Sequence, residues 1–148
     1  SSKLIMVGDG PDKKKAKDYL RKNNLKNSVI FLGKTNEVDE ILCSSDLFLL
    51  PSEKESFGLS ALEAMALKVP VVSTNTGGLK ELNINGNSGY TSEIGDIDSM
   101  ASNAIKILSD KSLKKKYRSQ AFENAKKYDI KKIIPLYEKI YDEALNIY

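Results

Sequence analysis

The chain of 148 residues contains 41% apolar and 29% charged residues, which is typical of a globular protein of about one domain. Its 23 basic and 20 acidic residues are largely interleaved, and this pattern argues against a nucleic-acid partner. The absence of histidine excludes a Ser-His-Asp triad and a His-ligated zinc site.

Several features favour a cytoplasmic location. No apolar run approaches the ~20 residues that a membrane-spanning helix needs, and no signal-peptide pattern opens the chain. The single cysteine, Cys43, excludes an internal disulfide and fits a reducing compartment. Residues 1–2 lead straight into an apolar run without an initiator methionine, which suggests either a cloning remnant or a piece of a longer polypeptide.

Apolar runs alternate with helical patterns along the first half of the chain. The runs lack polar alternation, as expected of parallel strands covered on both faces, and lie at 4–8, 29–33, 46–51 and 69–74. The helical patterns lie at 11–24, with Pro11 as the first helical residue, and at 35–45 and 58–68. This order predicts an α/β fold: a Rossmann-like open parallel sheet with helices on both faces.

After the turn cluster at 85–89 the chain is predicted to be helical to its end, with helices at about 96–109, 111–128 and 129–148. "DID" resembles a metal-binding D-x-D motif. Asp96, however, starts the first of these helices and Asp98 lies in its first turn, so capping and the helix dipole explain both carboxylates without a metal.

Ligands of open α/β sheets bind at the carboxyl ends of the strands, so the loops that follow the runs are candidate sites. Gly8 and Gly10 in "GDGP" fit either a nucleotide or a tight turn before a helix. Gly33 and Lys34 begin "GKT", which ends a phosphate-binding P-loop, but Ser28 stands where that motif requires a glycine.

The stretch "PSEKESFGLSALEAMA" contains two glutamates separated by seven residues. Only Ser60 and Glu63 are polar between 58 and 67, so the helix is predicted to be buried, with Glu63 in or beside the core. A buried carboxylate needs a partner, which is either a lysine or capped amides, or paired hydroxyls of a ligand. Glu55 precedes this helix, either as an ordinary exposed loop charge or facing the same ligand.

Between the two glutamates the helix begins with free N–H groups and a positive dipole end, which suit a phosphate. These amides belong to Phe57, Gly58, Leu59 and Ser60. One carboxylate for a ribose, a helix end for a diphosphate and a second carboxylate for another sugar would together bind a nucleotide sugar.

At these residues, and in "FGLSALEAMALKVPVVSTNTGGLKEL", the sequence resembles the C-terminal nucleotide-binding domain of retaining GT-B glycosyltransferases of family four. The resemblance covers essentially the whole chain, 1–148, as a single donor-binding domain. It implies that Glu63 holds ribose hydroxyls and that Glu55 binds and orients the donor sugar. It also implies a donor such as UDP-N-acetylglucosamine and a small hydroxyl acceptor such as L-malate.

The resemblance further implies a metal-independent reaction without cofactors, in which the leaving phosphate takes the acceptor proton. In the family, one strand and helix and an N-terminal acceptor domain precede the "KLIMVG" segment, so this chain is expected to hold about half of an active site. Gly77 and Gly78 either form a strand-to-helix turn or let the backbone approach the donor. Lys54 and Ser56 are further candidates for the sugar, and Gly8, Gly10, Gly33 and Lys34 for the donor.

Two other functions stay open at this point. A non-catalytic nucleotide-sugar-binding module would use the same helix end and glutamates. Binding to nucleic acid or a membrane surface would depend on lysines within 106–139, such as those of "KKKYR", which lie beside acidic residues as on a solvated surface.

The resemblance also predicts self-association. If 4–8 is the family's second strand, the strand between it and 46–50 is missing, so these runs either pair directly or leave a gap for another chain. The last helix carries an apolar stripe of Ile133, Tyr137, Ile140, Tyr141, Ala144, Leu145 and Tyr148, which would be exposed.

Overall fold

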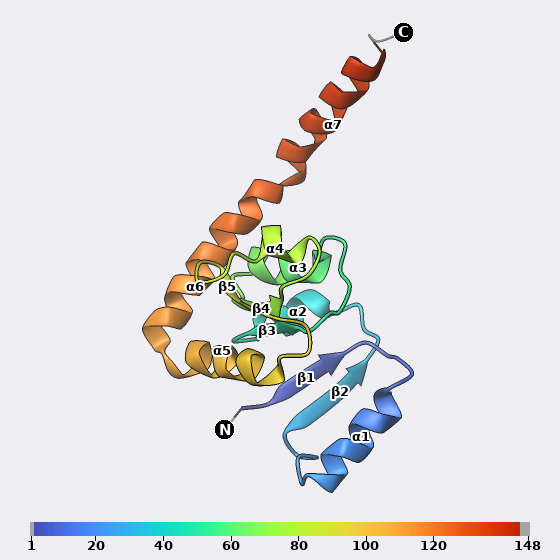
Figure 1. The fold of residues 1–148 in the computed structure, drawn as a ribbon, viewed down its shortest axis with the longest axis vertical. Coiled ribbons are helices and arrows are strands. Elements are labelled where there is room, and N and C mark those ends of the chain that lie inside the picture. The colour runs from blue at the N-terminus through green and yellow to red at the C-terminus, as the bar shows by residue number, and fades with distance from the viewer. Residues whose placement is uncertain (1, 146–148) are drawn as a thin grey trace. The chain divides into compact units, whose positions relative to one another are not determined.

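The computed structural model describes residues 2–145, which form two compact units divided after Ile41. Both contain parallel strands connected through helices, so the predicted α/β class is confirmed (Figure 1). Tyr148, the last residue of the predicted apolar stripe, lies outside the described residues.

The first unit consists of two parallel strands and a helix. Strand β1 (Leu4–Val7) pairs with β2 (Val29–Gly33), and helix α1 (Lys13–Lys22) connects them. Helix α2 (Val38–Cys43) spans the boundary between the units, which follows Ile41. The predicted helix start at Pro11 is wrong, because Asp12 is the N-cap and Pro11 lies in the preceding turn.

The first unit has no buried core of its own. All four residues of β1 are exposed, and none of the residues 2–41 is buried. The prediction that every strand is covered on both faces is therefore wrong for β1. Its apolar composition is that of a buried strand, but composition does not determine what covers a strand in space.

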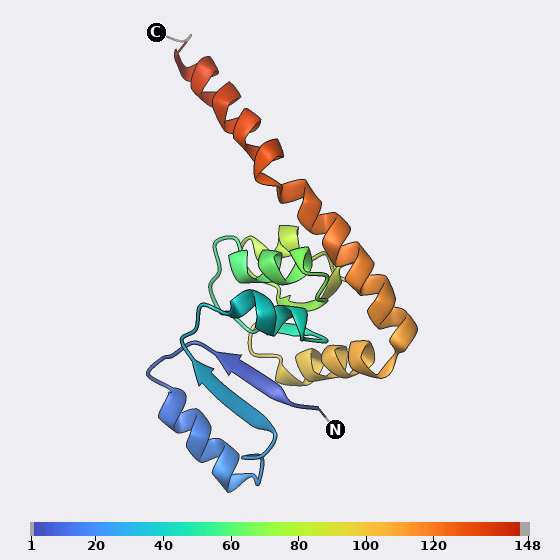
Figure 2. The same ribbon diagram turned by 180° about the vertical axis from the view of Figure 1, so that it is seen from behind.

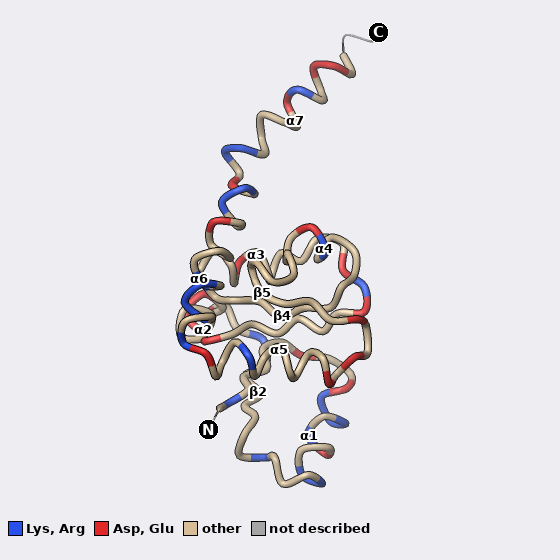
Figure 3. The backbone as a smooth tube through the Cα atoms, turned by 60° about the vertical axis from the view of Figure 1, so that its left-hand side comes forward, with Lys and Arg blue, Asp and Glu red and all other residues tan. Residues whose placement is uncertain are grey.

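The second unit contains a three-stranded parallel sheet in the order β3-β4-β5, formed by Phe48–Leu50, Val71–Thr74 and Gly89–Ser92. Helices α3 (Leu59–Ala66) and α4 (Leu79–Leu82) lie on one side of it and α5 (Ile97–Ser109) on the other (Figure 3). Strand β5 is a correction, since no strand was predicted after the turn cluster; its short sequence "GYTS" has no apolar run.

The strands of the described residues form two sheets, β1-β2 and β3-β4-β5. Direct pairing of the runs 4–8 and 46–50 is therefore wrong for this structure. The other predicted outcome, occupation of a gap by a further chain, stays a prediction.

The core of the second unit surrounds β4, whose four residues are all buried. Ile107 and Tyr117 pack with Val72 on the α5 side. On the α3 side the fully buried residues are Met65, Leu79, Leu82 and Val69. Because β4 is covered on both faces, it provides a rigid base for the loop that follows it.

A buried amide, Asn83, ties the strands to α4. Its Nδ2 donates to the carbonyl of Tyr90 at 3.0 Å and to the hydroxyl of Ser73 at 3.0 Å. The hydroxyl of Ser88 donates to its Oδ1 at 3.1 Å. A buried polar group that is satisfied in this way fixes the position of its neighbours, here the end of α4 against β4 and β5.

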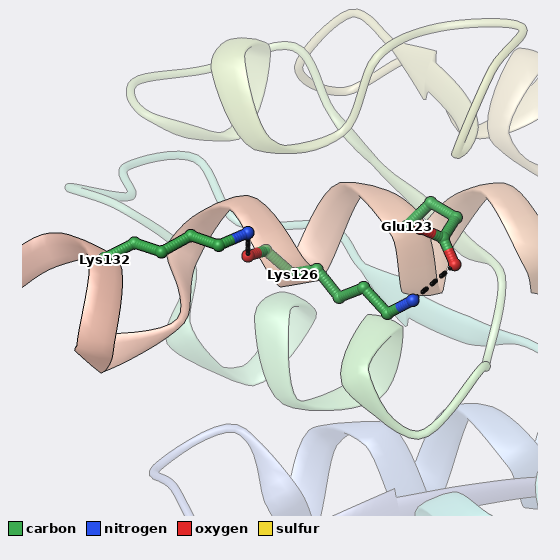
Figure 4. A network of polar contacts seen from close by, with 3 residues as sticks. All are labelled: Glu123, Lys126 and Lys132. Carbon is green, nitrogen blue, oxygen red and sulfur yellow. Dashed lines mark hydrogen bonds and ion pairs between the residues drawn. The ribbon is translucent and has the colours of Figure 1, made fainter.

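The C-terminal part is helical, as predicted. It comprises α6 (Lys111–Ala125), the 3₁₀ turn η1 (Lys126–Tyr128) and α7 (Ile130–Leu145) (Figure 2). At the joint between α6 and α7, Lys132 Nζ donates to the carbonyl of Lys126 at 2.8 Å, and Lys126 Nζ lies 2.7 Å from Glu123 Oε1 (Figure 4). No residue of α7 through Leu145 is buried: of the predicted stripe, Ile133 is partly exposed, and the exposed members are Tyr137, Ile140, Tyr141, Ala144 and Leu145.

Charge is distributed unevenly between the units. Residues 1–41 contain nine Lys or Arg against six Asp or Glu, whereas residues 42–148 contain fourteen of each. The basic residues of the first unit gather on α1 (Figure 3). The thiol of Cys43, at the end of α2, is exposed. Within residues 2–145 no helix is long and apolar enough to span a membrane.

Candidate functional site

Residues 51–58 form a loop between β3 and α3, which we call the acidic loop because it contains Glu53 and Glu55. It leaves the carboxyl end of β3, the edge at which parallel sheets bind ligands. Glu55 is partly buried, while Lys54 and Ser56 are exposed. The acidic loop therefore offers one carboxylate that is held against the protein and two polar side chains in solvent.

The last residue of β4 and the segment that follows it, residues 74–78, hold the acidic loop in place. The Oγ1 atoms of Thr74 and Thr76 donate to the carbonyls of Ser52 and Glu53, the latter at 3.2 Å. The amide of Gly78 then donates to the carbonyl of Glu55 at 3.3 Å. These threonines were not singled out from the sequence; the available signal was their position at and just after the end of a buried strand, β4.

Gly77 and Gly78 lie where the two segments are closest. A Cβ on Gly77 would lie 1.7 Å from the carbonyl oxygen of Glu55, and one on Gly78 would lie 2.4 Å from that of Ser56. Gly77 also has a φ of +48°, which favours glycine. The glycines thus let the segment after β4 pack against the acidic loop. This role is additional to the two that the sequence predicts, a strand-to-helix turn and close approach of the backbone to the donor.

Helix α3 begins at the end of the acidic loop without a side-chain cap. Gly58 is its N-cap, with a φ of +93°, and its carbonyl accepts from Ala61 and Leu62. Since no side chain caps this end, the first amides, including those of Leu59 and Ser60, remain available to an anion. A Cβ on Gly58 would lie 2.5 Å from Leu79, so glycine also lets α3 start close to α4.

Glu63 was predicted to lie in or beside the core, but its side chain is exposed. Helix α3 packs through Ala61, Ala64 and Met65, and Glu63 lies on the opposite side with Leu59, which is 65% exposed. The helix is apolar nearly all round, yet only one side is covered. Within residues 2–145 no ion pair joins Glu63 to a lysine, so the lysine interpretation has no support.

Phe57 anchors the other end of the acidic loop. Its ring meets that of Tyr128 edge to face, with centroids 5.3 Å apart, and the Tyr128 hydroxyl donates to the carbonyl of Glu81 at 3.4 Å. The ring of Phe57 is therefore engaged in the fold, and its backbone amide is the part of this candidate residue that remains for a ligand.

Four candidates from the sequence belong to the first unit. The amide of Gly8 donates to the carbonyl of Gly33 at 2.7 Å, which brings together the loops after β1 and β2. Gly10 accepts a turn hydrogen bond from Lys13 at 3.2 Å, and Lys34 is exposed. Lys13 also pairs with Asp9, and this hydrogen bond lowers the pKa of the Asp9 carboxyl.

The carboxylates of "DID" have the structural roles predicted for them. Asp96 caps α5, with its Oδ1 accepting from the amide of Ser99 at 2.9 Å, and Asp98 lies in the first turn. In the described part of the chain no group of three or more acidic or cysteine side chains could hold a metal ion.

The second unit therefore carries two carboxylates and a helix start along one stretch of chain, residues 55–63. Glu55 offers a partly buried carboxylate, the start of α3 offers amides without a side-chain cap, and Glu63 offers a carboxylate in solvent on the same helix. Carboxylates accept from paired hydroxyls, and helix amides donate to phosphate oxygens.

Comparisons with known proteins identify relatives for nearly the whole chain. Residues 1–128 match the family described as Glycosyl transferases group 1. The N-acetyl-alpha-D-glucosaminyl L-malate synthase of Bacillus anthracis is 41% identical over 145 residues, which cover 97% of this chain and 38% of that protein. The 2-deoxystreptamine N-acetyl-D-glucosaminyltransferase of Niallia circulans is 31% identical over 147 residues, covering 98% of this chain and 36% of that protein.

A solved structure is similar to this chain over most of the chain's length. The S. aureus TarM mutant in complex with fondaparinux, alpha-GlcNAc-glycerol and UDP superposes with a TM-score of 0.87 at 27% identity, covering 94% of this chain and 29% of that one. This chain spans less than two fifths of the length of each of these three proteins.

Proposed function

Because the chain belongs to the group 1 glycosyl transferases, we propose that it is the donor-binding part of a retaining glycosyltransferase. The observation that carries this proposal is the uncapped start of α3, flanked by Glu55 and Glu63 within the matched residues. Glu63 binds the ribose hydroxyls, the amides of Leu59 and Ser60 receive the diphosphate, and Glu55 binds hydroxyls of the donor sugar.

The exposure of Glu63 suits this role. A carboxylate in solvent reaches a ligand without first breaking a protein ion pair, and it becomes desolvated only when ribose hydroxyls replace water. Glu55 is partly buried and its backbone is held by Gly78, so the point from which its side chain extends toward the sugar is fixed. Electrostatic stabilisation of the departing diphosphate by helix amides is the chemical contribution of this part of the chain.

For the substrates we propose UDP-N-acetylglucosamine as donor and L-malate as acceptor. Support comes from the 41% identity to a protein named as an N-acetylglucosaminyl malate synthase and from UDP in the TarM complex. The remaining candidates, Gly8, Gly10, Gly33, Lys34 and Lys54, are proposed as further donor contacts, and the acceptor is proposed to bind to parts of the polypeptide outside this chain.

The experiment compares nucleotide binding with sugar transfer in the full-length enzyme. Glu55→Ala should reduce transfer from UDP-N-acetylglucosamine to malate far more than it reduces the affinity for UDP, since Glu55 is assigned to the sugar. Equal losses in both measurements would reassign Glu55 to the nucleotide. Binding of UDP without transfer to any acceptor would favour a non-catalytic binding module.

A further inference from the structure

The acidic loop is held by a ladder of contacts that continues the β3–β4 pairing beyond the ends of the strands. Within the sheet, Leu50 is opposite Ser73. Beyond it, Thr74, Thr76 and Gly78 lie two residues apart and bind the carbonyls of Ser52, Glu53 and Glu55 in turn. Side-chain hydroxyls thus take over where the backbone hydrogen bonds of the sheet end.

We infer that Thr74 and Thr76 are positioning residues for Glu55. By holding the backbone of the acidic loop, they place Glu55 where it contacts the donor sugar. This inference depends on the function proposed above. The two hydroxyls fix the backbone at Ser52 and Glu53, and the Gly78 amide fixes it at Glu55 itself. Three hydrogen bonds within four residues fix the backbone position from which the Glu55 side chain extends, and a misplaced group loses rate before it loses affinity for the rest of the ligand.

Thr76 is the better residue to change, because Thr74 is 2% exposed and its replacement would also disturb the core. Thr76 is partly exposed, and valine has nearly the same shape without the hydroxyl. Thr76→Ser retains the hydroxyl and serves as the conservative variant. Thr91→Val on β5 is a matched control, since the hydrogen bond recorded for Thr91 uses its backbone amide.

The test measures steady-state transfer and UDP binding in the full-length enzyme. Thr76→Val should lower kcat/KM for the nucleotide sugar about three- to tenfold, the effect of losing one hydrogen bond. The dissociation constant for bare UDP and the thermal midpoint should stay close to those of the Thr91→Val control. Thr76→Ser should recover most of the transfer.

A double-mutant cycle with Glu55→Ala decides whether Thr76 acts through Glu55. If it does, Thr76→Val has little further effect once Glu55 is alanine. Two outcomes would overturn the inference while leaving the proposed function intact. One is that Thr76→Val lowers kcat/KM by the same factor with Glu55 or with alanine at position 55. The other is that Thr76→Val weakens UDP binding as much as it lowers transfer. A wild-type enzyme that transfers no sugar would overturn the proposed function and this inference together.

Discussion

Glu63 on α3 is a residue whose replacement should affect ligand binding and leave folding unchanged. Glu63 is exposed and makes no ion pair within residues 2–145, so its replacement should not disturb the packing of α3 through Ala61, Ala64 and Met65. The side chain that is proposed to contact the ribose is thus free of a structural role, which makes it a clean probe.

Glu63→Gln is expected to weaken UDP binding by about 1–3 kcal/mol, the scale of lost charge-assisted hydrogen bonds. Its free energy of unfolding should stay within about 0.5 kcal/mol of wild type, as for surface changes in general. Titration calorimetry and urea denaturation measure the two quantities. Glu138→Gln on the exposed α7 is the control, and unchanged UDP affinity in Glu63→Gln would remove the ribose role.

The raised pKa of Tyr117 predicts how the free energy of unfolding depends on pH. Burial, together with the neighbouring Tyr90, raises the pKa of the Tyr117 phenol above its ordinary value near 10. The folded state therefore favours the neutral phenol, and its contribution to stability is present below about pH 10 and is lost as the pH rises above it. The free energy of unfolding should fall in this alkaline range, and less steeply in Tyr117→Phe. Equal slopes for both proteins would contradict this origin.

Among the elements, the contact between the segment after β4 and the acidic loop is expected to be the most sensitive to added volume. Gly77→Ala should destabilise the fold and weaken donor binding, because the new Cβ would lie 1.7 Å from the Glu55 carbonyl oxygen. Gly86→Ala is a matched control: Gly86 also has a positive φ, +76°, but its Cβ would meet open space. Chemical denaturation of both variants isolates the contact, and equal losses would mean that backbone strain alone matters.

The sequence was most informative about elements with a strong local signal. The runs at 29–33 and 69–74 contain β2 and β4, because short runs of β-branched and other apolar residues favour buried strands. Helices α5 and α6 begin within a residue of the predicted starts, since Asp96 and Asp110 cap their N-termini locally. Strand β5 was missed because it is held by partners distant in sequence, the β4 backbone and the Asn83 network.

The candidate site was predictable in its residue types and only partly in its geometry. The two glutamates around a helix start were predictable because the start is marked locally, by Gly58 before an apolar run. The exposure of Glu63 was not, because it depends on which side of α3 the rest of the fold covers. The support from Thr74 and Thr76 was equally hidden, since it arises only when β3 and β4 lie side by side.

At the scale of the whole molecule the two units differ in how much they bury. No residue among 2–41 is buried, whereas all four residues of β4 are. In the isolated chain of 148 residues, amides of β1 and β2 are therefore expected to exchange with solvent much faster than those of β4 and β5. Hydrogen exchange followed by mass spectrometry measures this, and equal protection of the two sheets would contradict the expectation.

The exposed thiol of Cys43 can form a disulfide with another copy of the chain. Because the chain has one cysteine, air oxidation can join it to one other chain and to no more. Oxidised protein on a non-reducing gel should therefore stop at a covalent dimer, which a reductant returns to single chains. Any larger species that survives in reductant must be held together by non-covalent contacts.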